Sequence, residues 1–81
     1  MYKVYILKSQ IYSRHYIGHT DNINNRLIRH NKGYVKSTKN YRPWNILYTE
    51  EFKTKQEACK RELQIKSYKG GEAFKKLINI R

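Results

Sequence analysis

The sequence predicts a small α+β domain whose elements follow the order ββαβαα. Two short β-prone segments lie close together near the start, a third follows a helix-like segment, and helical spacing dominates the last third of the chain. The chain of 81 residues has room for a single domain, residues 1–81, with a modest core.

The three β-prone segments are rich in β-branched and aromatic residues. Tyr2–Leu7 is predicted as a strand, and His15–His19 follows after a polar connection, so the two are expected to pair as a hairpin. Trp44–Phe52 is predicted as a further strand because large apolar side chains occupy alternate positions from Trp44 to Tyr48.

The first predicted helix is capped by Thr20 or Asp21 and closes at Gly33, where a left-handed conformation is favoured. Its apolar positions recur with helical spacing at Ile23, Leu27 and Ile28. A basic loop over residues 34–43 then leads to the third strand.

The second predicted helix begins with a capping box, in which Thr54 is the cap and Glu57 lies three residues on. It runs to about Tyr68, and its inward-facing candidates are Ala58, Cys59, Leu63 and Ile65. Gly70 and Gly71 break it, and the last short helix is marked by Phe74, Leu77 and Ile78.

Composition narrows the class of protein. No apolar run approaches the ~20 residues that span a bilayer, no signal-peptide hydrophobic segment is evident, and one cysteine cannot form an internal disulfide. An aromatic content of 14 % is too high for a disordered basic tail. We therefore expect a reduced, cytoplasmic domain with no membrane partner.

The charge indicates an anionic partner. Eighteen Lys and Arg residues face six Asp and Glu, which gives a formal charge of +12. Residues 22–49 contain no carboxylate and interleave cations with aromatic residues, a pattern that suits nucleic acid. The alternatives are a solvated surface or an anionic membrane. The cations expected to contact phosphates are Arg29, Lys32, Lys36, Lys39 and Arg42.

Four side chains in the first half of the chain are candidates for a catalytic site. Arg26 and His30 lie four residues apart and share one face of the predicted helix. Tyr5 and Tyr16 lie within the two hairpin strands, so their phenols can point into the same region. Gly18 leaves room for a sugar-phosphate backbone to approach closely.

Glu62 is the best candidate for a metal ligand. Six acidic residues in all argue against a two-metal site, which needs several converging carboxylates. One carboxylate with several waters suits a single Mg²⁺. The competing interpretation, slightly favoured by spacing alone, is an exposed ion pair between Glu62 and Lys66. His15 and His19 are expected to be surface strand residues, and Cys59 a small core residue.

Together these residues resemble the GIY-YIG nuclease superfamily, in particular its small single-domain bacterial members. The landmarks, in the family's order, are Val4-Tyr5-Ile6, Tyr16-Ile17-Gly18, Arg26, His30-Asn31-Lys32-Gly33, Arg42-Pro43-Trp44, Leu47-Tyr48, Arg61-Glu62 and Ile65-Lys66. The likeness covers about residues 2–78. Val4 departs from the pattern that names the family, because many members have glycine there.

The resemblance implies a three-stranded antiparallel sheet flanked by helices, and cleavage of DNA phosphodiester bonds with one divalent ion, Mg²⁺ or Mn²⁺. It implies catalytic roles for Tyr5, Tyr16, Arg26 and His30, and a catalytic, metal-binding role for Glu62. We expect Arg26 to neutralise charge in the transition state. Tyr5 is expected to be the general base, which requires Arg26 and the metal to lower its pKa from about 10.

Without a second domain to read a long site, DNA shape, ends or single-stranded character are the expected determinants, as for branched DNA in repair or recombination. The small core also allows a homodimer. Two other classes of function remain open. One is a non-catalytic basic nucleic-acid-binding module, which would not nick DNA with Mg²⁺; the other is a ribosome-associated structural protein, which would prefer structured RNA.

Overall fold

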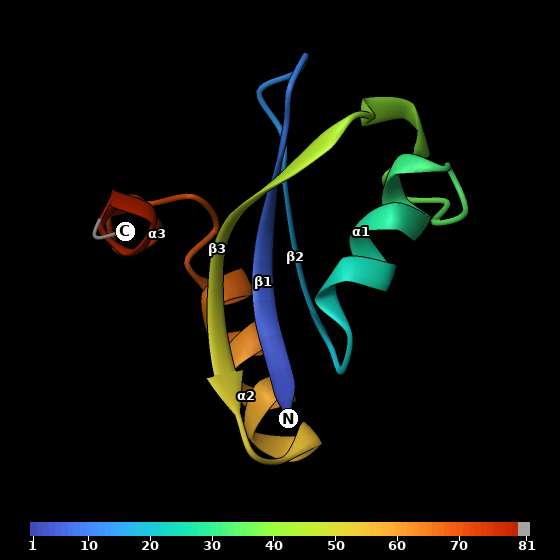
Figure 1. The fold of residues 1–81 in the computed structure, drawn as a ribbon. Coiled ribbons are helices and arrows are strands. Elements are labelled where there is room, and N and C mark those ends of the chain that lie inside the picture. Colours follow the sequence, from blue (N-terminus) through green and yellow to red (C-terminus); the bar gives the residue numbers. More distant parts are fainter. Residues whose placement is uncertain (80–81) are drawn as a thin grey trace.

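A computed structural model of the protein describes residues 1–79 (Figure 1). The elements in chain order are β1 (Tyr2–Ser9), β2 (His15–Thr20), α1 (Ile23–Asn31), the 3-10 helix η1 (Lys39–Tyr41), β3 (Trp44–Phe52), α2 (Lys55–Ser67) and α3 (Glu72–Asn79). The strands form one antiparallel sheet in the order β2-β1-β3. The predicted fold class and element order are therefore confirmed. Over residues 1–79, no helix is both long and apolar enough to cross a membrane.

The sheet separates two layers of helix. α1 lies against one face, and α2 and α3 lie against the other (Figure 1). Since β1 is the central strand, both of its faces are covered and its side chains alternate between the layers. Val4 and Ile6 pack beneath α2 and α3, whereas Tyr5 and Leu7 face α1.

The pairing between β1 and β3 contains a bulge. Ile6 lies opposite Tyr48, but Leu7 lies opposite Ile46, so Leu47 is an extra residue. The alternation predicted for the third strand therefore holds only on each side of Leu47. Ile46 packs in the cluster beneath α1, and Tyr48 packs against the cluster beneath α2 and α3.

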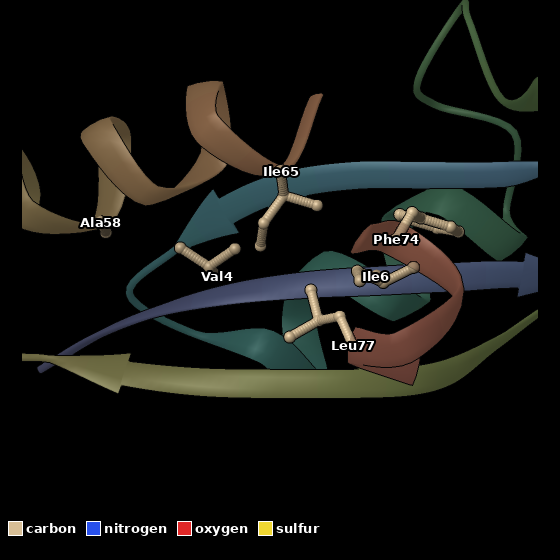
Figure 2. Close-up of a cluster of buried hydrophobic side chains, with 6 residues drawn as sticks. All are labelled: Val4, Ile6, Ala58, Ile65, Phe74 and Leu77. Atoms are coloured by element: carbon tan, nitrogen blue, oxygen red, sulfur yellow. The ribbon is translucent and has the colours of Figure 1, made fainter. Parts of the chain in front are cut away.

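The main apolar core lies between the sheet and the helices α2 and α3 (Figure 2). Its buried members are Val4, Ile6, Ala58, Ile65, Phe74 and Leu77. All six are apolar, and none is more than 9 % exposed. This layer therefore contributes stability by hydrophobic burial.

The inward stripe of α1 ends on a polar residue. Ile23 and Leu27 pack against the sheet, and His30, one turn further, is fully buried. Ile28, the third apolar position of the predicted helix, lies off this stripe and is 50 % exposed. The reason is that the spacing i, i+4, i+7 selects His30 as the third inward residue.

The inward stripe of α2 has a similar composition. Ala58 and Ile65 are buried, and Glu62 between them is only 14 % exposed at its side chain. Cys59 and Leu63 were predicted to face inward and are both exposed. They lie one position C-terminal to Ala58 and Glu62, which turns them about 100° away from the sheet.

The helix caps agree in part with the prediction. Thr54 and Glu57 form the predicted capping box at the start of α2. The cap of α1 is Asn22 rather than Thr20 or Asp21, and its side chain accepts a hydrogen bond from the backbone N–H three residues on. The helix α1 is therefore shorter at its start than predicted.

Candidate active site

Three aromatic rings from β1, β2 and α1 meet on the α1 face of the sheet. The ring centroids of Tyr5 and Tyr16 are 6.2 Å apart, those of Tyr5 and His30 are 6.0 Å apart, and those of Tyr16 and His30 are 4.8 Å apart. Tyr5 and His30 are 1 % and 0 % exposed, whereas Tyr16 is half-buried. Of the two predicted phenols, Tyr16 is therefore the one that solvent reaches.

Hydrogen bonds connect the buried members of this cluster in a chain. The Thr38 hydroxyl lies 3.3 Å from the Val35 carbonyl, to which it donates, and 2.8 Å from His30 Nδ1. His30 Nδ1 therefore carries the proton, and Nε2 accepts the Tyr5 phenol proton across 3.1 Å. This chain fixes the imidazole tautomer and the direction of the Tyr5 hydroxyl.

The surroundings keep both buried groups neutral at pH 7. Burial raises the pKa of Tyr5 well above its usual value, and Tyr16 adds to the effect. Burial also lowers the pKa of His30 to about 4, helped by the charges of Arg26 and Arg29. Tyr5 therefore retains its proton, and His30 acts as a hydrogen-bond acceptor.

Gly18 makes room for the Tyr5 ring. Gly18 pairs with Tyr5 across β1 and β2, and a Cβ added at Gly18 would lie 2.7 Å from the Tyr5 hydroxyl and 3.1 Å from the Tyr16 ring. The space that the sequence suggested for a sugar-phosphate backbone is therefore filled by a side chain of the protein. A larger residue would displace the buried phenol.

Arg26 borders a small open pocket at the end of β2. The pocket has a volume of about 210 Å³ and is lined by Tyr2, His19, Thr20, Asp21, Arg26 and Lys55. Arg26 is half-buried, one position before Leu27 of the apolar stripe of α1. A guanidinium held in this way can face an incoming phosphate with little loss of side-chain entropy.

Both carboxylate oxygens of Glu62 have partners. Oε2 lies 2.6 Å from Lys66 Nζ, and Oε1 lies 2.5 Å from His19 Nδ1. Burial alone would raise the pKa of Glu62, but hydrogen bonds from Lys66 and His19 outweigh it and hold the pKa below its usual value. The predicted pair with Lys66 is thus present, and Glu62 is nonetheless largely buried and ionised.

Arg26 and Glu62 reach the end of β2 from opposite faces of the sheet. β2 is an edge strand, so side chains from the two faces can meet around it. His19, which borders the same pocket as Arg26, contacts Glu62 directly. After burial and Tyr16, the charges of Arg26 and Glu62 also act on the pKa of Tyr5, in opposite directions. The structure thus places all five predicted site residues around β2.

The five cations predicted to contact phosphates are exposed. They lie on the outer side of α1 and along the loop that follows it: Arg29, Lys32, Lys36, Lys39 and Arg42. Asn31 ties this loop to β3, because its side chain accepts the Trp44 N–H at 2.6 Å and donates to the Trp44 carbonyl at 3.1 Å. These two hydrogen bonds hold the two ends of the cation-bearing loop together.

Sequence reasoning missed two contacts of the site. His19 was expected on the surface, yet it is half-buried against Glu62. The strand period contained a signal for this, because His19 shares a face with Ile17, which packs beneath α2. Thr38 had no such signal, since only the fold of the loop brings it to His30.

Comparisons with known proteins identify the family of this chain. The model of a family described as the GIY-YIG catalytic domain matches residues 1–75. The UPF0213 protein SERP0126 of Staphylococcus epidermidis is 46 % identical over 66 residues, which cover 80 % of this chain and 79 % of that protein. A UPF0213 protein of Staphylococcus aureus is 44 % identical over 66 residues, which again cover 80 % of this chain and 79 % of that protein. The solution NMR structure of the UPF0213 protein BH0048 from Bacillus halodurans is similar with a TM-score of 0.62 and 26 % identity, over 99 % of this chain and 84 % of that one.

Proposed function

Because this chain belongs to the GIY-YIG catalytic domain family, we propose that it is an endonuclease that hydrolyses DNA phosphodiester bonds with a single divalent ion. The observation that carries the proposal is the convergence at the end of β2. Arg26, from one face, lines a pocket together with His19, and Glu62, from the other face, contacts His19. The rings of Tyr5, Tyr16 and His30 cluster on the α1 face of the same two strands. A cation and a carboxylate so arranged suit a phosphate and a metal ion.

The residues present fit a divalent ion. Glu62 offers an ionised carboxylate. Within residues 1–79, no group of three or more His, Cys, Asp and Glu residues lies close enough together to hold a metal ion. Such an ion would take most of its ligands from water and substrate phosphate, as Mg²⁺ does readily. When bound, it supplies positive charge beside the scissile phosphate and its leaving oxygen.

Arg26 has the role of stabilising charge on the phosphate. Its guanidinium can donate two parallel hydrogen bonds to non-bridging oxygens. Because the side chain is already half-buried before substrate arrives, it needs less reorganisation as negative charge accumulates in the transition state. Lys55 lines the same pocket and adds to the positive field there.

We assign contact with the attacking water to Tyr16 rather than to Tyr5. Tyr5 is 1 % exposed, donates its proton to His30 and has a raised pKa, so it is poorly placed to act as a base. Tyr16 is half-buried and packs on the neutral His30 ring. This revises the expectation that Tyr5 is the general base. Tyr5 then acts as a positioning residue that orients His30.

The hairpin tip, at the other end of β2 from the pocket, offers a surface that suits DNA with unpaired or branched segments. At the hairpin tip, Tyr12 lies edge-on to Tyr41 with ring centroids 5.4 Å apart, and Arg14 lies 4.5 Å above the Tyr41 ring. Tyr12 is 49 % exposed. An exposed ring beside the basic loop can stack on an unpaired base. We therefore propose a preference for branched or single-stranded DNA, as arises in repair or recombination.

Two finer predictions accompany the proposal. One is a cytoplasmic location, and the other is a homodimer, which would bury more surface than this small core can bury alone. Size-exclusion chromatography with light scattering measures the mass of the particle in solution and tests the second of these.

The proposal is tested by incubating the protein with supercoiled plasmid, branched DNA and structured RNA, each with and without Mg²⁺. We expect nicking of DNA only with the ion. Glu62→Gln should abolish cleavage and retain DNA binding, whereas Glu51→Gln, the same change at an exposed carboxylate of β3, should leave cleavage intact. DNA binding without any Mg²⁺-dependent nicking would instead favour a non-catalytic module, and selective binding of structured RNA would favour a ribosome-associated protein.

The assignment of the phenols is tested with matched substitutions. Tyr16→Phe should lower the cleavage rate about 100-fold or more, in the range of general acid–base effects. Tyr5→Phe removes the same oxygen from a buried ring and should have the smaller effect on rate and a measurable effect on stability. The reverse order would return the base role to Tyr5.

A further inference from the structure

His19 stands out among the titratable residues that the expected chemistry does not use. It projects from β2 toward α2, where its Nδ1 atom lies 2.5 Å from Glu62 Oε1. Its side chain is 23 % exposed, and it borders the pocket that Arg26 also lines. His19 is therefore in contact with the carboxylate, accessible from solvent and close to where a phosphate would enter.

We propose that His19 is a second protein ligand of the divalent ion, beside Glu62, and that it makes the site favour Mn²⁺ over Mg²⁺. The inference rests on the proposed function in assuming that an ion binds at Glu62. It adds a ligand and a metal preference to that site.

The separation of the two side chains suits one ion. Adjacent ligands in an octahedral sphere with bonds of about 2.1 Å lie about 3 Å apart. His19 Nδ1 and Glu62 Oε1 are 2.5 Å apart. For one ion to contact both atoms, the imidazole gives up the Nδ1 proton and keeps its proton at Nε2, both side chains turn toward the ion, and the two atoms separate by about half an ångström. The two side chains project from regular elements, β2 and α2, and rotation about side-chain bonds can bring both to the ion without a movement of either backbone.

The ion pair between Glu62 and Lys66 leaves one carboxylate oxygen free to bind an ion. Lys66 contacts Oε2, so Oε1 and the imidazole nitrogen can turn to the ion while Lys66 keeps its ion pair. The Thr20 and Asp21 side of the pocket leaves room for water, and Arg26 and Lys55 attract the substrate phosphate that completes the sphere.

The metal preference follows from the nitrogen ligand. Carboxylate and water oxygens suit Mg²⁺ and Mn²⁺ alike, but an imidazole suits transition metals much better than Mg²⁺. One histidine beside one carboxylate therefore strengthens Mn²⁺ binding with little effect on Mg²⁺. The competing explanation is that His19 only positions Glu62 through a hydrogen bond. That explanation predicts equal effects on the two metals.

The test measures Mn²⁺ bound to the free protein, without DNA. Electron paramagnetic resonance titrations give the affinity for Mn²⁺, competition with Mg²⁺ gives the second affinity, and electron spin echo modulation detects a directly bound nitrogen. The variants are His19→Gln, which can still donate a hydrogen bond to Glu62, and His15→Gln as the matched control from the same strand. Circular dichroism confirms that each variant folds.

We expect His19→Gln to weaken Mn²⁺ binding about tenfold, to change Mg²⁺ binding little and to remove the nitrogen modulation. His15→Gln should change none of the three. The inference is overturned if His19→Gln retains the nitrogen signal or binds Mn²⁺ as the parent does. It is also overturned if both metals weaken equally. Glu62→Gln separates this from the proposed function, because loss of metal binding and cleavage there upholds the nuclease even if His19 proves not to be a ligand.

Discussion

The two faces of the sheet are built from different kinds of side chain. Beneath α2 and α3, all six members of the buried cluster are apolar. Beneath α1, the buried groups include Tyr5, His30, Thr38 and Trp44, and each of these polar side chains has a hydrogen-bond partner. Among the described residues, no buried side-chain N or O atom lacks such a partner.

The difference teaches how this small domain separates stability from chemistry. An apolar layer is stabilised by the surface area that it buries and tolerates many side-chain arrangements. A polar layer in which every buried group is hydrogen-bonded fixes one geometry. The central strand β1 serves both, since Ile6 belongs to the first layer and Tyr5 to the second. Glu62 then joins the site from the apolar side, around the edge strand.

The largest expected effect is on stability and comes from the apolar face. Ile65→Ala removes three carbons from a fully buried side chain and should cost about 2–5 kcal/mol of unfolding free energy. Ile65→Val, which removes one carbon, should cost about 0.5–1.5 kcal/mol. Denaturant unfolding measures both changes. The folded fraction of each variant should cleave DNA at the parent rate. A small loss for Ile65→Ala would show that this face does not carry the stability.

The polar face should make stability depend on pH. His30 has a pKa of about 4 in the folded state, against 6.5 when unfolded, so below pH 6.5 the unfolded chain takes up a proton that the folded chain does not. The full contribution is present above pH 6.5 and is lost as the pH falls toward 4, by about 3 kcal/mol. Denaturant unfolding at several pH values measures this slope.

His30→Gln should remove most of that slope. His15, whose pKa is lowered by burial and by Lys8, acts in the same direction, so His15→Gln should remove a smaller part. The carboxylates whose pKa is depressed, Glu50 and Glu62, lose their contribution only below about pH 4.5 and therefore act in a lower range. An unchanged slope in His30→Gln would contradict a neutral, buried imidazole.

The smallest effect sharpens the comparison through DNA affinity. Replacing Lys36 and Lys39 by Ala should weaken binding about equally on different sequences and reduce the salt dependence by about one unit of slope for each lysine. Lys75 and Lys76 are exposed on α3, across the sheet, and the same double change there should have little effect. Equal losses from both pairs would show that charge, and not the α1 face, determines binding.

The fold could be predicted because its signals are local. Strand alternation, the Thr54–Glu57 capping box and the breaks at glycine are all readable within a few residues. The contacts of the site are not local, since His19 and Glu62 are 43 residues apart in the sequence. Leu63 shows where a local interpretation fails. This apolar residue was predicted to face inward, but it is exposed, and the neighbouring Glu62 is largely buried instead. The resemblance predicted five site residues, but the side chains that they contact could be found only from the structure.

The most direct test of the central claim compares two arginines of α1 in single-turnover cleavage at saturating DNA. Arg26 is half-buried beside the pocket, and Arg29, three residues on, is exposed. Arg26→Ala should lower the rate constant about 100- to 1000-fold with little change in affinity, and Arg29→Ala should weaken affinity and leave the rate constant unchanged. If Arg26→Ala cleaves bound DNA as fast as the parent does, the α1 face only docks DNA and the account is wrong.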